Sequence, residues 1–268
     1  MKKVLFTLSV ACLLCSGISA QIKIGKTSIG KGKIDAVKNV SKALTVSDEE
    51  IASAAAKSVK YMDENNPVCS TKDKDKKKKA YAERLERIFG PYKNYDGLNL
   101  NYKVYYVTDI NAFACPDGSV RVFSSLMDIM TDDELLGIIG HEIGHVKLEH
   151  SKKAFKQALL TEAAAKYAGD TQGSVSAMVN SDIGTVAQNL TGAQFSQTQE
   201  SAADDYAYKF LVSIGKDPQA LVTGFTKFAE MEKKAGSDKS LQSKMFSSHP
   251  DSEKRAKKIS EKIKKSKK

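Results

Sequence analysis

The chain has 268 residues, 41% of them hydrophobic and 28% charged, which is typical of a soluble globular protein and long enough for one catalytic domain. The net charge of +10 comes mainly from lysine runs at residues 72–80 and 253–268. Because no aromatic side chains are interleaved with these lysines, we exclude nucleic acid as a partner and interpret the runs as solvated surface, with peripheral contact to an anionic membrane surface or acidic polymer as the alternative.

The first twenty residues, MKKVLFTLSVACLLCSGISA, have the pattern of a secretory signal peptide. Two lysines precede an apolar stretch from Val4 to Cys15, and small residues end the segment at Ala20. The apolar stretch is shorter than the roughly 20 residues that span a bilayer, and no second stretch of that length follows. We therefore expect an exported protein, periplasmic or secreted, with no transmembrane span in the mature chain. A lipoprotein anchor at Cys12, which follows Ala11, is the alternative.

Residues 21–45 mix glycine, lysine and isolated isoleucines without a sustained period, and we expect a flexible lead-in there. One domain is predicted at residues 46–265. It opens with a capping box, Ser47 and Glu50, before an amphipathic helix, and a second amphipathic helix is predicted over residues 81–89.

Two β-branched and aromatic runs, residues 102–109 and 120–125, predict strands. A turn signal, Pro116-Asp117-Gly118, separates them. A small antiparallel pair is the simplest arrangement of the two strands.

Export affects the interpretation of the cysteines. Cys69 and Cys115 remain after the signal peptide is removed, and an oxidising compartment would allow them to form one disulfide. Two unpaired thiols are the alternative, because a disulfide needs a geometry that the sequence does not specify. Neither cysteine belongs to a C-x-x-C pair, so we do not expect them to bind metal.

Thr131 and Glu134 form a second capping box, which starts a helix that is expected to run past Lys152. Residues 169–192 are rich in glycine, serine, asparagine and threonine and are a candidate for a loop or lid. Helical periodicity resumes over residues 193–214, and two further helices follow, the last of them basic.

The helix after the second capping box carries LLGIIGHEIGHVKLEH, with His141, Glu142 and His145 inside an apolar run. Residues four apart lie on one face of a helix, so the two histidines can direct their imidazoles to one point, with Glu142 on the adjacent face. This H-E-x-x-H arrangement supplies two ligands for one Zn²⁺ per chain and a carboxylate that can act on a water molecule. Gly140 and Gly144 lower the stability of the helix interior, which predicts close approach of another element.

A catalytic zinc site needs a third protein ligand. The metzincin pattern is ruled out because Leu148 and Ser151 stand where it requires glycine and histidine. His150 is out of register with the other two histidines and is expected to be structural. Glu200 and Asp204 lie four residues apart on a later helix, and we predict the first as third ligand and the second as an acceptor that orients a histidine. A solvated acidic face is the alternative.

Four segments between about residue 111 and residue 259 carry a family resemblance: NAFACPDGSVRVFSSLMDIMTDDEL, GIIGHEIGHVKLEH, ESAADDYA and SSHPDSEKRAKKI. They resemble the HtpX- and BepA-like zinc metallopeptidases, which also include the CAAX prenyl endopeptidases, in peptidase family forty-eight of the metallo class. The resemblance supplies Glu200 as third ligand, in agreement with the helix spacing. It also implies an α+β, mainly helical zincin-like fold with a small antiparallel sheet and an active-site helix that carries HEIGH.

The resemblance implies roles for further residues. The strand that contains Val120, Arg121 and Phe123 would be an edge strand that pairs with an extended substrate. His249 would lie over the metal, either as a reversible fourth ligand of an idle enzyme or as a donor to the developing oxyanion, with a surface histidine as the alternative. Arg255 is expected to be a structural ion-pair partner.

These features favour an exported zinc endopeptidase, with zinc held by His141, His145 and Glu200 and with Glu142 as proton acceptor and donor. The resemblance, together with the lack of membrane spans, implies the soluble, exported branch of the family. Misfolded or stalled envelope proteins, bound as unfolded or extended polypeptides, are the substrates it implies. Two alternatives are a chaperone-like protein that binds clients and holds a structural or latent zinc, and a basic module that binds an acidic polymer.

Overall fold

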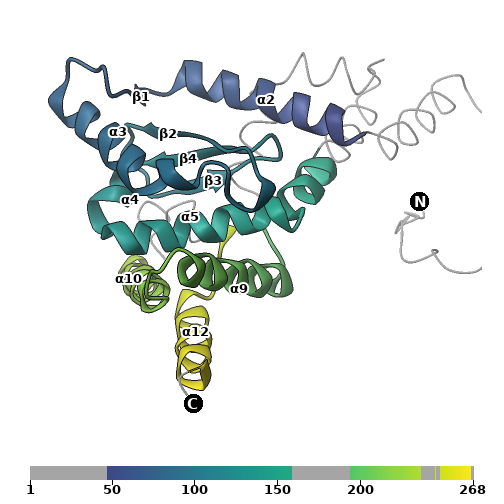
Figure 1. The fold of residues 1–268 in the computed structure, drawn as a ribbon, viewed down its shortest axis with the longest axis vertical. Coiled ribbons are helices and arrows are strands. Elements are labelled where there is room, and N and C mark those ends of the chain that lie inside the picture. The colour runs from purple at the N-terminus through teal and green to yellow at the C-terminus, as the bar shows by residue number, and fades with distance from the viewer. Residues whose placement is uncertain (1–46, 159–193, 237–244, 246–247, 267–268) are drawn as a thin grey trace, which may run out of the picture.

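Figure 1 shows a computed structural model of the chain, which describes residues 47–158, 194–236, 245 and 248–266. The predicted signal peptide, the lead-in and the loop or lid candidate at residues 169–192 lie outside the described residues. The described part is mostly helical and contains a small mixed sheet. The helices are α2 (Asp48–Asn65), α3 (Lys76–Phe89), α4 (Ser124–Ile129), α5 (Asp132–Lys147), α9 (Gln197–Ser213), α10 (Gln219–Ala235) and α12 (Ser252–Ser266), and the strands are β1 (Val68–Cys69), β2 (Asn101–Tyr105), β3 (Ala112–Ala114) and β4 (Ser119–Phe123).

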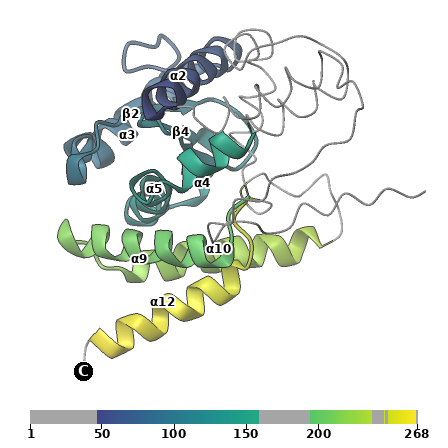
Figure 2. The ribbon, with the colours of Figure 1, turned by 90° about the vertical axis from the view of Figure 1, so that its right-hand side faces the viewer.

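The elements form layers around α5 (Figures 1 and 2). Helix α2 covers one face of the sheet and α5 the other, while α9 and α10 pack on the far side of α5 and α12 lies below them. Side chains alternate along the strands, as expected for a sheet that is buried on both faces. Tyr105 and Phe123 belong to the apolar cluster under α2, whereas Val104 and Val122 belong to the larger cluster around α5.

The sheet has the strand order β1-β2-β4-β3 and contains both parallel and antiparallel pairs. Strands β2 and β4 are parallel, so the predicted antiparallel pairing of these two runs is wrong. The turn at Pro116-Asp117-Gly118 instead joins β4 to the short strand β3, and these two strands are antiparallel. The three-residue strand β3 was not recognised because it is too short to show an alternating pattern.

Strand β4 lies inside the sheet between β2 and β3, so the prediction that it is an edge strand is wrong. Its backbone N–H and C=O groups form hydrogen bonds with β2 on one side and β3 on the other. Val120, Arg121 and Phe123 therefore have no free backbone groups with which a substrate strand could pair. Arg121 is 1% exposed, and its Nε donates to Asp63 Oδ1 of α2 at 2.8 Å. This side chain fastens α2 to the sheet.

The predicted disulfide does not form, because Cys69 and Cys115 are both free and buried. Cys69 lies in β1 at one edge of the sheet, and Cys115 directly follows β3 at the opposite edge. Three strand spacings separate the edges, or about 14 Å at the usual distance between strands. A disulfide requires Cα atoms within about 7 Å.

Local helix signals are confirmed where a capping box was predicted. Ser47 caps α2 with Glu50, and Thr131 caps α5 with Glu134. Helix α3 starts earlier than predicted, at Lys76, because the side chain of Asp75 accepts hydrogen bonds from the first turn. Among the described residues, no helix is both long and apolar enough to cross a membrane.

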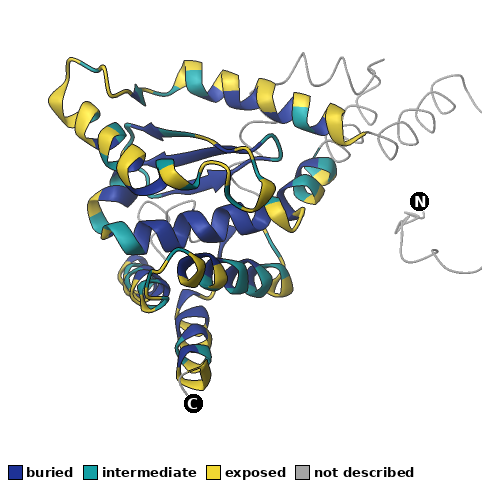
Figure 3. Ribbon diagram, in the orientation of Figure 1, coloured by how far each residue is buried: buried dark blue, intermediate teal, exposed yellow. Residues whose placement is uncertain are grey.

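Helix α5 is buried along almost its whole length (Figure 3), and α9 crosses it at the two glycines. A Cβ atom on Gly140 would lie 2.7 Å from Cδ1 of Phe210, and one on Gly144 would lie 3.3 Å from Cα of Ala203. The predicted close approach of another element is therefore confirmed. The absence of these two side chains lets the N-terminal turns of α9 reach the polar residues of α5.

Candidate metal centre

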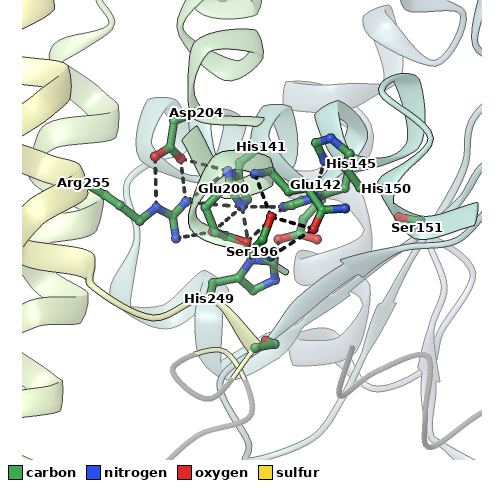
Figure 4. Close-up of polar contacts among 12 residues, drawn as sticks. His141, Glu142, His145, His150, Ser151, Ser196, Glu200, Asp204, His249 and Arg255 are labelled. Atoms are coloured by element: carbon green, nitrogen blue, oxygen red, sulfur yellow. Dashed lines mark hydrogen bonds and ion pairs between the residues drawn. The ribbon is translucent and has the colours of Figure 1, made fainter. Parts of the chain in front are cut away.

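Two histidines of α5 form the floor of the site (Figure 4). His141 is 2% exposed and His145 is 1% exposed, and their Nε2 atoms lie 3.1 Å apart. The separation of four residues brings the two rings to one face of the helix, as the sequence predicts.

The first turns of α9 bring Glu200 to the same point. Its Oε2 lies 3.4 Å from His141 Nε2, and its Oε1 lies 3.4 Å from His145 Nε2. Burial alone would raise the pKa of this carboxyl group, but the three surrounding histidines hold it well below its usual range. Glu200 is therefore an anion at neutral pH.

His249 completes the cluster from the segment that precedes α12 (Figure 4). Its Nδ1 lies 3.2 Å from His141 Nε2 and 3.0 Å from Glu200 Oε1. Its Nε2 faces the other way, 3.5 Å from Glu142 Oε1. The side chain thus stands between the three predicted ligands and Glu142.

The donor atoms of His141, His145, Glu200 and His249 all lie within 4.8 Å of one another and are buried. The separations given above are 3.0 to 3.4 Å. A tetrahedron whose corners are about 2.0–2.1 Å from a central zinc ion has edges of about 3.3–3.4 Å, and these five separations are close to that value. Glu200 Oε2 accepts no hydrogen bond from the described residues, but Arg255 forms an ion pair with it at 2.9 Å.

Glu142 lies beside the cluster, with His249 Nε2 3.5 Å from its Oε1. It is 3% exposed, and its Oε1 accepts no hydrogen bond within the described residues. Burial raises the pKa of this carboxyl group. A carboxylate with a raised pKa and an unused oxygen next to a metal site is suited to accept a proton.

Asp204 lies one turn after Glu200 and faces the other nitrogen of His141, with Oδ1 2.9 Å from Nδ1. Arg255 of α12 donates to both oxygens of this carboxylate, at 3.0 and 2.6 Å, and its Nη1 lies 2.9 Å from Glu200 Oε2. Burial would raise the pKa of Asp204, but Arg255 and His141 lower it to about 2. The ion pair predicted for Arg255 is thus made with Asp204, which also faces His141.

The structure places two further rings against His145: Phe195, which the sequence reasoning did not single out, and His150, which was expected to be structural. The ring of Phe195, just before α9, stacks on His145 with a centroid distance of 3.8 Å and an angle of 22°. His150 lies with its Nδ1 3.0 Å from Nδ1 of His145. The prediction of one helix past Lys152 is wrong, because the helix breaks at Leu148 and resumes at His150.

Comparison with known proteins agrees with this geometry. The family model described as "Peptidase family M48" matches residues 75–263. The chain is 38% identical over 222 residues to Metalloprotease LoiP of Escherichia coli (strain K12), which covers 82% of this chain and 83% of the relative. It is 37% identical over 226 residues to Metalloprotease YcaL of the same organism, with 84% of each chain covered.

A more distant relative is the Mitochondrial metalloendopeptidase OMA1 of Arabidopsis thaliana, which is 26% identical over 234 residues, or 87% of this chain and 43% of the relative. The family model covers most of the chain, and both bacterial relatives match nearly over their whole length. These matches, together with the buried cluster of histidines and glutamate, show that the protein belongs to peptidase family M48 and is a metalloendopeptidase.

Proposed function

We propose that the protein is a zinc-dependent endopeptidase of the cell envelope that hydrolyses unfolded or extended polypeptides. The observation that carries this proposal is the buried set of His141, His145 and Glu200 with Glu142 beside it. A site of this donor type is common to zinc hydrolases, which need three protein ligands and one position for a reacting molecule.

Glu142 performs the proton transfers in this proposal. Bound between the three ligands, zinc would polarise the substrate carbonyl and make a water molecule more acidic. Glu142 Oε1, which accepts no hydrogen bond from the described residues, would take the proton that a water molecule loses when it attacks the carbonyl carbon. The carboxyl group then gives the proton to the nitrogen of the leaving amine, so that the residue returns to its starting state.

Strand β3, rather than β4, is suited to hold the substrate. Hydrogen bonds at Asn111 and Cys115 join it to β4, so the antiparallel alternation turns the backbone groups of Ala112 and Ala114 toward the opposite side. No described strand pairs with that side, and β3 packs directly on α5. Ser151 Oγ donates to the carbonyl of Ala114 at 3.1 Å and so closes one end of the free edge. Because Ala112 and Ala114 are buried, an extended peptide would pair with what remains of this edge only after the edge has been uncovered.

His249 keeps the site idle in this proposal. With its Nδ1 in the cluster, four protein groups surround the metal position, and four protein ligands are typical of closed zinc sites. Cleavage then requires that the imidazole leave the cluster. If His249 instead stabilises the oxyanion, its removal has the opposite effect on the rate, so the variant His249→Ala distinguishes the two roles: faster cleavage supports the idle state, and slower cleavage supports the donor.

The first experiment measures zinc content and casein cleavage for the wild type and for Glu142→Gln, which keeps the shape of the side chain but removes its proton acceptor. We expect about one zinc per chain in both proteins and a loss of turnover of about 10²- to 10⁴-fold in the variant. Unchanged turnover by the zinc-loaded variant would contradict the assignment of Glu142.

A second function is favoured by the closed arrangement of four protein donors, which is typical of structural zinc. In that case the protein binds unfolded clients along β3 and does not cleave them. Suppression of client aggregation by Glu142→Gln at the wild-type level, with no cleavage by either protein, would support this alternative.

The cell-envelope location rests on the signal-peptide pattern of residues 1–20. A role in the removal of misfolded exported proteins follows from that location and from the preference for extended chains that an edge strand imposes. Fractionation of cells and mass spectrometry of the mature N-terminus test both export and cleavage after Ala20. A lipidated cysteine at the mature N-terminus would show that the protein is anchored as a lipoprotein and not released.

A further inference from the structure

The chain breaks its catalytic helix at one specific place. Helix α5 ends at Lys147, Leu148 and Glu149 form a turn, and the chain is helical again from His150. Glu149 has a φ of 59°, a left-handed conformation that is unfavourable for a residue with a side chain. The sequence offers no glycine at this turn to relieve it.

The break changes the direction of His150. In a continuous helix of 3.6 residues per turn, a residue five positions after His145 would point about 140° away from it. After the break, the Nδ1 atoms of the two rings are 3.0 Å apart and His150 is 8% exposed. The left-handed residue therefore brings a buried imidazole back to the end of the active-site helix.

The hydrogen bond between the two rings requires a proton on one Nδ1 and a lone pair on the other. His145 directs Nε2 to the cluster, so a lone pair must be available there, and the proton of the neutral ring must be on Nδ1. The group that faces this N–H is Nδ1 of His150, which can accept it only when the proton of His150 is on its own Nε2. His141 receives the corresponding support from Asp204, so the two histidines of α5 are held by different chemical groups.

We propose that His150 is a positioning residue for the metal site: it accepts the Nδ1–H of His145 and so fixes the tautomer and orientation of that ring. Phe195 stacks on the ring of His145 and restricts its tilt. The hydrogen bond with His150 then restricts rotation of the ring within its own plane. The proposal rests on the proposed zinc site and extends it to a residue outside the ligand set.

The test compares two substitutions of similar size. In His150→Asn, the side-chain Oδ1 can take the place of Nδ1 as acceptor, whereas His150→Leu has no acceptor. Zinc affinity is measured for the purified proteins by competition with a chromogenic chelator, with His141→Ala as the control for loss of the site. We expect His150→Leu to bind zinc about 10- to 100-fold more weakly than wild type, as is usual when a partner of a ligating histidine is lost. The Asn variant should stay within about threefold of wild type.

Three results would overturn the inference. Equal zinc affinity of His150→Leu and wild type would contradict the inference directly. A lower unfolding temperature of metal-free His150→Leu with unchanged zinc affinity shows a structural role only. If the wild type itself binds no zinc, the proposed function fails as well, and this outcome is recognised because His141→Ala then does not differ from wild type.

A second measurement needs no variant. Nitrogen NMR shifts of the histidine rings in the zinc-loaded wild type report which nitrogen of His150 carries the proton. We expect the proton on Nε2 and an unprotonated Nδ1. A proton on Nδ1 of His150 would exclude it as the acceptor for His145 and would overturn the proposal even if the Leu variant did not fold.

Discussion

Substitution of Gly140 by alanine tests whether the contact between α5 and α9 is as close as the structure shows. The added Cβ atom would lie 2.7 Å from Cδ1 of Phe210, well inside the normal contact distance. Phe210 is fully buried, and its ring also makes edge contacts with Tyr92 and Tyr95, so it has little room to move away. Helices α5 and α9 must therefore shift relative to each other.

Two opposing effects set the magnitude. Forcing a methyl group into a well-packed core costs about 1–3 kcal/mol, and alanine is favoured over glycine inside a helix by about 0.5–1 kcal/mol. We therefore expect Gly140→Ala to lower the free energy of unfolding by about 1 kcal/mol, the difference between the midpoints of these two ranges. Because the same shift changes the position of Glu200 of α9 relative to the histidines of α5, zinc affinity should fall as well.

Gly224 of α10 provides the matched control. Its Cβ atom would meet its nearest neighbours at 3.8 Å, an ordinary contact, so only the helix preference remains. Urea unfolding of the metal-free proteins should show Gly224→Ala as stable as wild type or more stable by about 0.5–1 kcal/mol. A Gly140→Ala protein that is also as stable as wild type would refute the reasoning from the close approach.

Three further predictions concern single contacts. The lowered pKa of Asp204 in the metal-free protein means that this group contributes stability above its ordinary pKa of 3.8 and that the contribution is lost as the pH falls toward about 2. Urea unfolding should therefore show that Asp204→Asn has a lower free energy of unfolding than wild type at pH 7 and that the difference is smaller at pH 3. A difference that does not depend on pH would contradict the link to Arg255. Because Cys69 and Cys115 lie at opposite edges of the sheet, the unfolding temperature should be the same with and without reductant, and a decrease on reduction would show that they are bonded. Glu149→Gly should raise the free energy of unfolding by up to about 1–2 kcal/mol because glycine adopts the left-handed backbone without strain. Loss of the ion pair between Glu149 and Lys152 reduces this gain. A decrease in the free energy of unfolding would show that φ at this residue is not strained.

The features that were predictable from the sequence are those that depend on helix geometry. The spacing of His141 and His145 on one face, and of Glu200 and Asp204 on another helix, follows from residues four apart whatever the rest of the chain does. The capping boxes at Ser47 and Thr131 are equally local. Such signals survive because few long-range contacts can change them.

The features that were missed depend on pairings across long stretches of chain. Nothing in the residues of β4 shows that β2 lies beside it in parallel, and the short strand β3 that occupies the edge has only three residues. The partner of Arg121, Asp63, is 58 residues away. The contact of His150 with His145 was not predicted for a different reason, because a left-handed glutamate breaks the helix where the sequence shows no glycine or proline.

The distribution of the site along the chain has a consequence for biosynthesis. His141 and His249 are 108 residues apart in the sequence, and Arg255 follows both of them. A growing polypeptide therefore cannot assemble the complete cluster until the residues as far as Arg255 have been synthesised and α12 has packed on α9 and α10. Partly made chains therefore lack both Arg255, which donates to Asp204, and His249, which lies between the cluster and Glu142.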